Sequence, residues 1–406
     1  MDADVLVVGA GHNGLVAAAL LARDGADVLV LERRDVPGGA IAEEELVPGY
    51  WFPTCAYALH LLHERVVEEV GLSLPELRPL GEKVFVVEGA VVHESELGDR
   101  IGAEYDAWTT RWSRAAEVVD EFLLREAPTH EDVCAAVQDA ELADFLDLSY
   151  EQLLERSFRD ERSRRLLAPT LPIHADRPGS PLAYAYFRTE TLRPKRYQGI
   201  PVAGMRAVAD AFAAAAELAG ACIEYGVEVT RLRGDGVETG GRSIRARAVL
   251  SCLDPARTAA LAGYSVAFDA EPPGTKIHVV AREPLDLTGV VYVLDGDGVI
   301  EVQPHDRERV SLYLPFSRPH PGEALARVGD VLGVEGEAFV HGPDELERRI
   351  GLTGGSIHHG TQGPLDRPGP ETAIGGLFLC GAGAHPGGEV SGVPGWHAAR
   401  AVRRHL

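Results

Sequence analysis

The chain has 406 residues, 45% of them hydrophobic and 25% charged, which is the composition of a soluble globular protein. Asp and Glu (62) outnumber Lys and Arg (39), so the formal net charge is −23. A surface this acidic repels phosphate backbones and anionic lipid, which argues against nucleic-acid binding and electrostatic membrane docking. Five scattered cysteines without a CxxC pair exclude a disulfide framework and a zinc site.

The chain start also bears on localisation. Met1-Asp2-Ala3-Asp4 is acidic where a signal peptide would be basic, and charged residues or glycines interrupt every apolar stretch well short of the ~20 residues of a membrane span. The sequence therefore predicts a cytoplasmic protein for which membrane contact is not expected. It does not indicate an oligomeric state.

The first forty residues contain a dinucleotide-binding pattern. Apolar runs at 5–8 and 28–31 predict buried parallel strands, and 15–23 is periodic like a helix. Between the first strand and the helix stands the GxGxxG segment 9–14 (GAGHNG). Its glycines permit a tight turn, a close approach to a pyrophosphate and close helix–strand packing, and the helix N-terminus attracts the phosphates.

Two further features follow the second strand. Glu32 stands 18 residues after Gly14, where an acid accepts hydrogen bonds from ribose hydroxyls and disfavours the 2′-phosphate of NADP. Arg33 and Arg34 then precede Gly38-Gly39-Ala40, a segment that a nicotinamide-binding unit does not need. A plain surface turn at Pro37-Gly38 is the alternative.

The last forty residues repeat the arrangement of strand, glycine-rich loop and helix. The strand is expected at 375–380, the loop at 381–395 and the helix at 396–405. One NAD needs a single such unit, whereas an extended FAD is held by one loop at its adenosine end and by another near its flavin. A helix N-terminus aimed at the flavin also stabilises the reduced ring. FAD is therefore the predicted cofactor.

The middle of the chain predicts a different architecture. Helical patterns cover 103–124 and 131–167, and an Ala-rich helix is expected at 205–218. Short β-like runs with turn residues between them predict a mixed sheet; they lie at 222–232, 245–252, 276–281, 290–294 and 310–314. The expected cofactor domain is discontinuous, at 1–75, 200–262 and 365–406. The expected substrate domain comprises 76–199 and 263–364.

Residues 377–399 (LFLCGAGAHPGGEVSGVPGWHAA) closely resemble the C-terminal FAD signature of phytoene desaturase-like flavoproteins. They look most like the branch of pyridine nucleotide-disulfide oxidoreductase domain proteins. Residues 33–40 are similar to the second signature of amine oxidase and phytoene desaturase flavoproteins. Similar segments lie at 47–59, 204–206, 228–231, 248–255 and 352–360.

The resemblance implies an α/β fold in which a Rossmann-like FAD-binding domain, of the glutathione reductase and amine oxidase type, is interleaved with a mixed-sheet and helical substrate domain. The cofactor contacts predicted by motif and resemblance together are Gly9, Gly11, His12, Asn13, Gly14, Glu32, Arg33, Gly38, Gly39, Ala40, Val229, Gly381, Ala382, Gly392, Val393 and Pro394. The chain is short for this family, and the missing length is expected on the substrate side. Glu389 and Arg206 stand where the family has glycine.

Four residues are predicted to act in catalysis. His385 and Glu389 lie in the loop expected near the flavin, with hydrogen bonding inside the loop as the alternative. Tyr57 and His60 follow the Gly-Gly segment toward the expected active site. His60 and His63 have the spacing of one helix face, but without a third ligand no metal site is predicted.

Other conspicuous residues receive more ordinary interpretations. The adjacent His358 and His359 diverge, so joint metal ligation is not expected, and Cys380 is read as part of the core. The basic cluster 193–196 is either a solvated turn or an anchor for a substrate carboxylate.

The predicted function is an FAD-dependent oxidoreductase that dehydrogenates a small-to-medium organic substrate by hydride transfer to flavin N5. The product bond is C=C or C=N, or the reaction oxidises an amine or an alcohol, with oxygen or an unknown acceptor reoxidising the flavin. The alternatives are a carotenoid or terpenoid desaturase at a membrane surface and a redox-neutral FAD-dependent isomerase.

Overall fold

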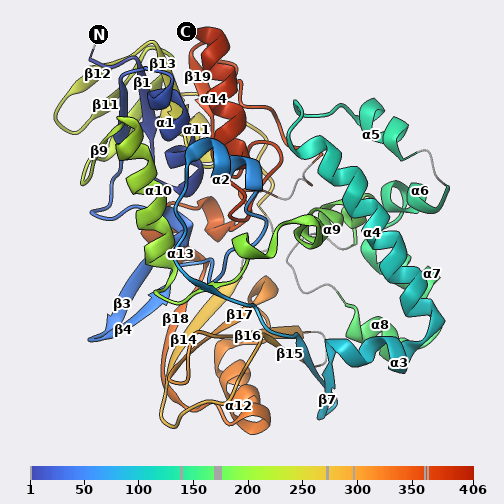
Figure 1. Ribbon diagram of the computed structural model, residues 1–406. Coiled ribbons are helices and arrows are strands. Elements are labelled where there is room, and N and C mark those ends of the chain that lie inside the picture. Colours follow the sequence, from blue (N-terminus) through green and yellow to red (C-terminus); the bar gives the residue numbers. More distant parts are fainter. Residues whose placement is uncertain are drawn as a thin grey trace.

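A five-stranded parallel sheet lies at one end of the molecule in the computed structural model (Figure 1). The structure describes residues 2–137, 140–168, 176–270, 274–295, 298–360, 363 and 365–406. The strand order is β19-β13-β1-β2-β9, and every neighbouring pair is parallel. The strands are β1 (Val5–Val8), β2 (Val28–Leu31), β9 (Cys222–Glu224), β13 (Ala248–Ser251) and β19 (Leu377–Leu379).

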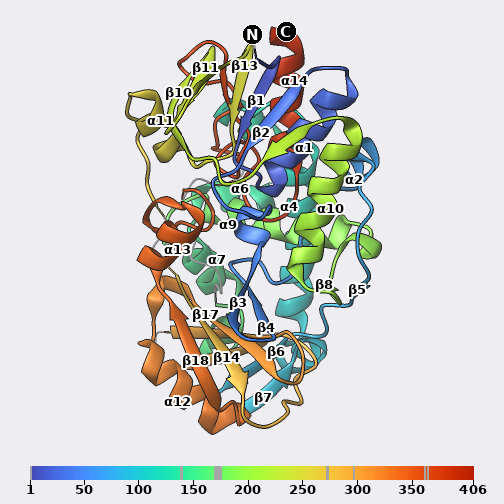
Figure 2. The same ribbon diagram turned by 90° about the vertical axis from the view of Figure 1, so that its left-hand side faces the viewer.

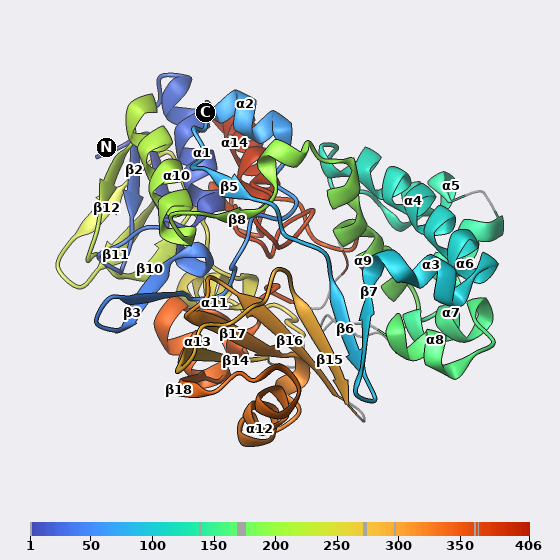
Figure 3. The same ribbon diagram turned by 60° about the horizontal axis from the view of Figure 1, so that its bottom comes forward.

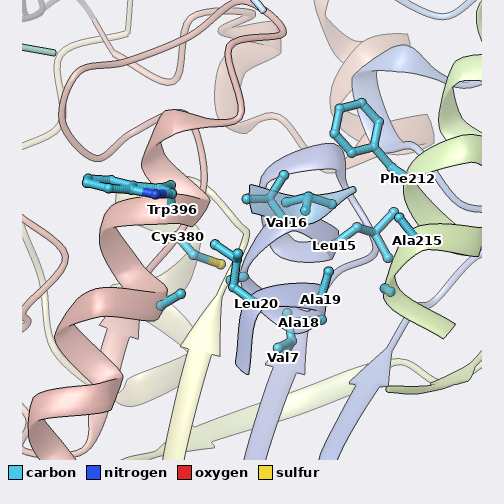
Figure 4. Packing of buried hydrophobic residues seen from close by; sticks show 14 of the residues in the cluster. Val7, Leu15, Val16, Ala18, Ala19, Leu20, Phe212, Ala215, Cys380 and Trp396 are labelled. Carbon is cyan, nitrogen blue, oxygen red and sulfur yellow. The ribbon is translucent and has the colours of Figure 1, made fainter. Parts of the chain in front are cut away.

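Helix α1 (His12–Arg23) packs between the sheet, α10 (Met205–Ala219) and α14 (Val393–His405), as Figure 4 shows. Its residues from His12 to Ala22 are all buried, so it is an apolar helix enclosed on every side rather than an amphipathic one. Phe212 of α10 and Trp396 of α14 are the largest side chains packed around it. The N-terminal and C-terminal thirds of the chain thus share one core.

The other face of this sheet is covered by a small antiparallel sheet. It consists of β10 (Val229–Arg233), β11 (Gly236–Thr239) and β12 (Ser243–Arg245). Helix α11 (Pro255–Ala262) packs against β10. Leu232, Val237 and Ile244 meet Leu6 and Val249 of the parallel sheet in one apolar cluster.

A seven-stranded mixed sheet forms the opposite end of the molecule (Figure 2). Its order is β18-β14-β17-β16-β15-β6-β7, and of these pairs only β15 and β6 are parallel. The strands are β6 (Val84–Val87), β7 (Ala90–His93), β14 (Thr275–Ala281), β15 (Val291–Asp295), β16 (Gly298–Pro304), β17 (Arg309–Leu314) and β18 (Gly336–His341). Helix α12 (Pro321–Leu332) covers one face through Ala324 and Val328.

Side-chain alternation along these strands separates an apolar face from a polar one. Ile277 and Val279 of β14 and Ile300 and Val302 of β16 pack under α12. The residues between them point to the other face, and Lys276, Glu301 and Gln303 are buried there. The same alternation that builds the core therefore sets polar side chains opposite α12.

A helical lobe lies beside the two sheets (Figure 3). Trp108, Trp112, Phe145, Tyr150 and Phe158 form the centre of its core. The helices are α3 (Leu97–Ile101), α4 (Ala103–Leu123), α5 (His130–Ala136), α6 (Ala140–Asp147), α7 (Tyr150–Ser157), α8 (Glu161–Leu166) and α9 (Ser180–Arg188). The remaining elements are α2 (Glu64–Val70), α13 (Pro343–Ile350), the β3 (Glu43–Val47)–β4 (Tyr50–Pro53) ribbon and the β5 (Leu77–Arg78)–β8 (Ile200–Pro201) pair.

The predicted fold class is confirmed, and two predicted elements are corrected. The helical region 131–167 is divided among α5 to α8, with residues 138–139 outside the described part. The β-like run 222–232 is two strands in different sheets, since β9 joins the parallel sheet and β10 the small antiparallel one. The parallel-sheet strands fall within the three segments expected for the cofactor domain, and the domain boundaries themselves stay a prediction.

The enclosed position of α1 gives a testable expectation. Phe212→Ala removes a fully buried ring from the α10 face and should lower the free energy of unfolding by about 3–5 kcal/mol, measured by urea denaturation. Leu218→Ala, on the same helix but 89% exposed, should change it by less than about 0.5 kcal/mol. Equal effects of the two substitutions would contradict the packing described.

Candidate functional site

The first glycine-rich loop is held by close backbone contacts. Gly9 donates its N–H to Leu31 O (2.9 Å), and α1 begins at His12 with Gly11 as its N-cap. A Cβ on Gly14 would lie 2.5 Å from Gly9 O, so only glycine fits there. The first turn of α1 is therefore pressed against the end of β1, as the motif predicts.

The second glycine pair packs on the first loop rather than forming a separate surface turn. Gly38 donates its N–H to Ala10 O (2.8 Å), and Gly11 and Gly38 form a parallel bridge. The segment 38–40 thereby lines the same cleft as the GxGxxG loop.

Glu32 is fixed at the edge of this cleft. Its buried carboxylate accepts the N–H of Ala10 (2.7 Å) and the N–H of Arg34 (2.9 Å). Arg33 donates to the carbonyl oxygens of Arg348 and Arg349 at the C-terminal end of α13 (3.3 and 3.0 Å). The acid predicted to bind ribose is thus preorganised by backbone donors, while Arg33 ties α13 to the cleft.

Three buried polar atoms on this cleft have no hydrogen-bond partner within the described part of the chain. They are His12 Nε2, Asn13 Oδ1 and Arg34 Nη1. Unpaired buried polar atoms are rare in folded proteins because each costs desolvation energy, so these atoms suit a polar ligand. Burial, with a smaller contribution from His359, lowers the pKa of His12 to about 4, so its ring is neutral at pH 7.

Most of the predicted cofactor residues line the narrow cleft or its continuation. They are Gly9, Gly11, His12, Asn13, Glu32, Arg33, Gly38, Gly39, Ala40, Val229 and Ala382. Gly14, Gly381, Gly392, Val393 and Pro394 are buried and are not among the described residues that line it. A Cβ on Gly381 would lie 2.6 Å from Cys252 O, so this position serves packing. Contact with a cofactor stays a prediction for all of the predicted residues, those that line the cleft included.

The narrow cleft, of about 120 Å³, meets a cavity of about 1240 Å³. His12, Ala40, His359 and Ala382 line both. Because the first two belong to the N-terminal loops and Ala382 to the C-terminal loop, the junction brings the two ends of the chain together.

Three of the four predicted catalytic residues, Tyr57, His60 and Glu389, line the large cavity. Burial raises the pKa of Tyr57 well above its usual value, so the phenol stays protonated. His60 Nδ1 lies 3.2 Å from Glu190 Oε1; burial opposes the charged ring, but the hydrogen bond and charge of Glu190 raise the pKa of His60. His60 and Glu190 therefore form a hydrogen-bonded pair on the cavity wall, and Glu190 favours the charged form of the ring.

Glu389 adopts a left-handed backbone conformation with φ 62°. This region costs a non-glycine residue about 1–2 kcal/mol, and the resemblance places glycine at this position. A carboxylate facing the cavity is thus kept at a conformational cost, which is common at functional sites.

His385 lies away from the cavity. Its Nε2 is 3.0 Å from Phe122 O, and Nε2 of His397 is 2.8 Å from Leu123 O. The two rings, 5.4 Å apart, therefore donate to the last carbonyl groups of α4 and hold the helical lobe against the C-terminal loop. The structure supports a positioning role for His385 and not the predicted catalytic one, and the partner lies in another element rather than in the loop.

The predicted helix through His60 and His63 is also corrected. His60 lies in the loop before α2, and His63 is the N-cap of that helix, where its Nδ1 accepts the N–H of Arg65 (3.1 Å). The capping role explains the position of His63. Within the described ranges, no group of three or more His, Cys, Asp or Glu side chains is placed to hold a metal ion.

A polar chain on the seven-stranded sheet was not predicted. Lys276 Nζ donates to Cys55 O and to Gln303 Oε1 (3.2 Å), and Gln303 Nε2 donates to Glu301 Oε1 (2.9 Å). Burial lowers the pKa of Lys276 and raises that of Glu301. The sequence does carry a signal for this chain, since polar residues alternate with apolar ones along these strands. That alternation predicts a polar site only when the strand pairing shows that the polar residues share one face of the sheet.

The fold and this loop geometry define a dinucleotide-binding protein with a Rossmann-type domain. A model of the NAD(P)-binding Rossmann-like domain matches residues 7–70. Over 99% of this chain, pyridine nucleotide-disulfide oxidoreductase domain-containing protein 2 of Rattus norvegicus is 27% identical, with 94% of that protein covered. Hydroxyneurosporene desaturase of Cereibacter sphaeroides is also 27% identical, over 99% of this chain and 98% of its own length.

Among solved structures, cyclohexylamine oxidase from Brevibacterium oxydans shares the fold with a TM-score of 0.68, 19% identity and full coverage of both chains. These comparisons confirm the predicted resemblance and the predicted class of enzyme, an oxidoreductase. The alignment with the rat protein spans 549 positions against 406 residues here, so that protein contains segments that this chain lacks. In the part of the chain that the structure describes, no helix has the length and apolar character to cross a membrane.

The contact of His397 with α4 predicts a pH dependence. Burial lowers the pKa of His397 to about 4, so protonation below its unfolded pKa of about 6.5 favours the unfolded chain. Its contribution to stability is complete above about pH 6.5 and is lost as the pH falls toward 4. Between pH 7 and 5, His397→Gln should lose about 1–2 kcal/mol less stability than the wild type in urea denaturation.

The exposed His405 supplies the control for this measurement. His405→Gln should reproduce the wild-type difference between the two pH values. A His397→Gln variant with an unchanged pH dependence would contradict the buried neutral imidazole.

Proposed function

We propose that the chain is an FAD-dependent oxidoreductase that dehydrogenates a small-to-medium organic substrate held in the large cavity. The observation that carries the proposal is the junction of the two spaces at His12, Ala40, His359 and Ala382. A cofactor longer than the cleft would pass from Glu32 and Val229, beside the ribose and adenine, to the cavity that holds the substrate. NAD in the cleft alone would leave the role of the C-terminal loop unexplained.

The residues present fit FAD. Glu32, Arg34 and Val229 would hold the adenosine end, and backbone N–H groups at the N-terminus of α1, beside Gly11 and Asn13, would hold the pyrophosphate. When bound, FAD supplies an acceptor for a hydride from a substrate carbon.

When the hydride leaves the substrate, a residue of the cavity wall has to accept the substrate proton. The protonated phenol of Tyr57 would donate a hydrogen bond to a substrate oxygen or nitrogen, and the His60 ring, held by Glu190, would present its other nitrogen to the substrate. Glu389 supplies a carboxylate that can accept a substrate proton as the hydride leaves. Oxygen or another electron acceptor would complete the cycle.

A desaturase of an apolar substrate is the second candidate. It is supported by the similarity to hydroxyneurosporene desaturase and by the leucines and prolines of segment 72–80 that line the cavity. The polar chain through Lys276, Gln303 and Glu301 on the opposite wall favours a substrate with at least one polar group.

The cofactor prediction has a direct test. The purified chain should show flavin absorption, as isolated or after incubation with FAD, and Gly14→Ala should lower the FAD content strongly because its Cβ meets Gly9 O. Gly241→Ala, whose Cβ meets nothing within 4 Å, should bind FAD like the wild type. A well-folded wild type that remains colourless after incubation with FAD would refute the proposal.

The catalytic assignment is tested by anaerobic flavin bleaching with amines, amino acids, alcohols and polyenes. With a substrate found in this way, Glu389→Gln should lower the reduction rate constant roughly 100-fold through loss of the proton acceptor. His385→Gln keeps a donor for Phe122 O and should stay within a few-fold of the wild type. A larger loss of rate in His385→Gln than in Glu389→Gln would support a catalytic role for His385 and exclude Glu389 as the proton acceptor.

A further inference from the structure

Lysine is nearly absent from the chain, and its three occurrences share one location. The sequence contains only Lys83, Lys195 and Lys276, and arginine supplies every other basic side chain. All three lysines line the large cavity, although only 40 of the residues that the structure describes belong to its lining. The few ammonium groups of the chain are therefore gathered around one cavity, where each presents a positive charge on a flexible side chain.

Two of these lysines stand where the cavity opens to solvent. Lys83 directly precedes β6 and Lys195 begins a short 3₁₀ turn at 195–197, and both side chains are exposed. Both lysines lie close enough to act on the same carboxylate, that of Glu190. Burial raises the pKa of Glu190, but the hydrogen bond and charge of His60 lower it, and the charges of Lys83 and Lys195 lower it further. Lys195 Nζ has a long contact of 3.5 Å with Gln198 Oε1, which leaves it able to turn to a ligand.

The basic cluster 193–196 is thereby divided between two roles. Arg193 is buried and binds Glu64 Oε2 (3.0 Å) and Asp120, so it is structural. Lys195 and Arg196 line the cavity, and Arg188 of α9 joins them there. Lys195 and Arg196 are thus exposed residues of a turn that also line the cavity, and their role as an anchor for a substrate carboxylate stays a prediction.

The charge of the lining differs from that of the protein as a whole. Lys83, Arg188, Lys195, Arg196 and Lys276 stand against four carboxylates, Glu94, Glu190, Glu301 and Glu389. Lys276 and Glu301 belong to the buried polar chain, so the rest of the lining carries Lys83, Arg188, Lys195 and Arg196 against Glu94, Glu190 and Glu389. Because Lys83, Lys195 and Arg196 are exposed, the opening has an excess of positive charge in a chain with a net charge of −23, and it attracts anions.

The rim beside these cations is apolar. Leu74, Pro75, Leu77, Pro79 and Leu80 line the cavity just before Lys83 in the chain. A surface that joins a leucine and proline wall to exposed ammonium groups is complementary to a molecule with an apolar body and an anionic head group.

From this arrangement we infer that the cavity takes an amphipathic anion, whose head group pairs with Lys83 and Lys195 at the opening and whose apolar body extends inward along the rim of residues 74–80. The inference rests on the proposed function, since it names the substrate class of that cavity. A carboxylate and a phosphate head group share the required chemistry, and an aliphatic amine does not.

Isothermal titration calorimetry with ten-carbon probes tests this inference. Decanoate should bind the holoprotein more tightly than 1-decanol, and decylammonium should bind most weakly. The double variant Lys83→Gln/Lys195→Gln should weaken decanoate binding roughly ten-fold and leave 1-decanol binding unchanged. Decyl phosphate binding more tightly than decanoate would assign the head group to phosphate, and the reverse order to carboxylate.

Two further variants control the measurement. Lys83→Arg/Lys195→Arg keeps both charges and should bind decanoate within about three-fold of the wild type. Arg282→Gln removes an exposed charge paired with Glu335, outside the cavity lining, and should have no effect. Raising the salt concentration should weaken decanoate binding to the wild type more than to the glutamine double variant.

The inference would be overturned by equal affinities for decanoate and 1-decanol, by a glutamine double variant that binds decanoate like the wild type, or by preferred binding of decylammonium. The calorimetry measures binding without turnover, so its outcome is independent of the outcome of the flavin tests. A colourless protein that still binds decanoate through the lysines would refute the redox function alone. A flavoprotein indifferent to the anion would refute the substrate class alone.

Discussion

The close approach of α1 and α14 is the contact on which the rest of the structure depends. A Cβ on Gly395 would overlap Asn13 O, so the C-terminal helix lies directly against the first turn of α1. That contact joins chain segments separated by more than 370 residues and sets the C-terminal loop beside the GxGxxG loop. Without it, Ala40 and Ala382 would not share a wall, and the cleft would not open into the large cavity. The burial of α1 on every side follows from the same geometry.

The second constraint comes from the seven-stranded sheet. Strand alternation allows one face to be apolar under α12 while the other carries Lys276, Glu301 and Gln303 into the cavity. The cavity thus has one wall beside the GxGxxG loop and a polar wall from the seven-stranded sheet. The helical lobe, held through His385 and His397, supplies α9 and with it Arg188 and Glu190. The lining of the cavity therefore comes from three parts of the chain that meet only in the folded protein.

Glu389 and His385 show how far a motif can be interpreted. Both stand in the same glycine-rich loop, four residues apart, and the sequence offers no means of separating them. In the structure Glu389 faces the cavity in a left-handed conformation, while His385 turns toward the carbonyl end of α4. A loop without periodic structure does not fix the direction of its side chains, so their roles depend on what packs against it.

The sequence by itself determined the dinucleotide-binding loop, the buried strands on either side of it, the second glycine-rich loop and the resemblance to flavoprotein oxidoreductases. These signals are local, because backbone sterics and short-range periodicity require particular residues at fixed spacing. Only the tertiary structure decided which side chains face the cavity, among them the lysines at its opening, the pair of His60 with Glu190 and the polar chain through Gln303. Such contacts join residues far apart in the chain, and strand register and helix docking, which no short segment encodes, bring them together.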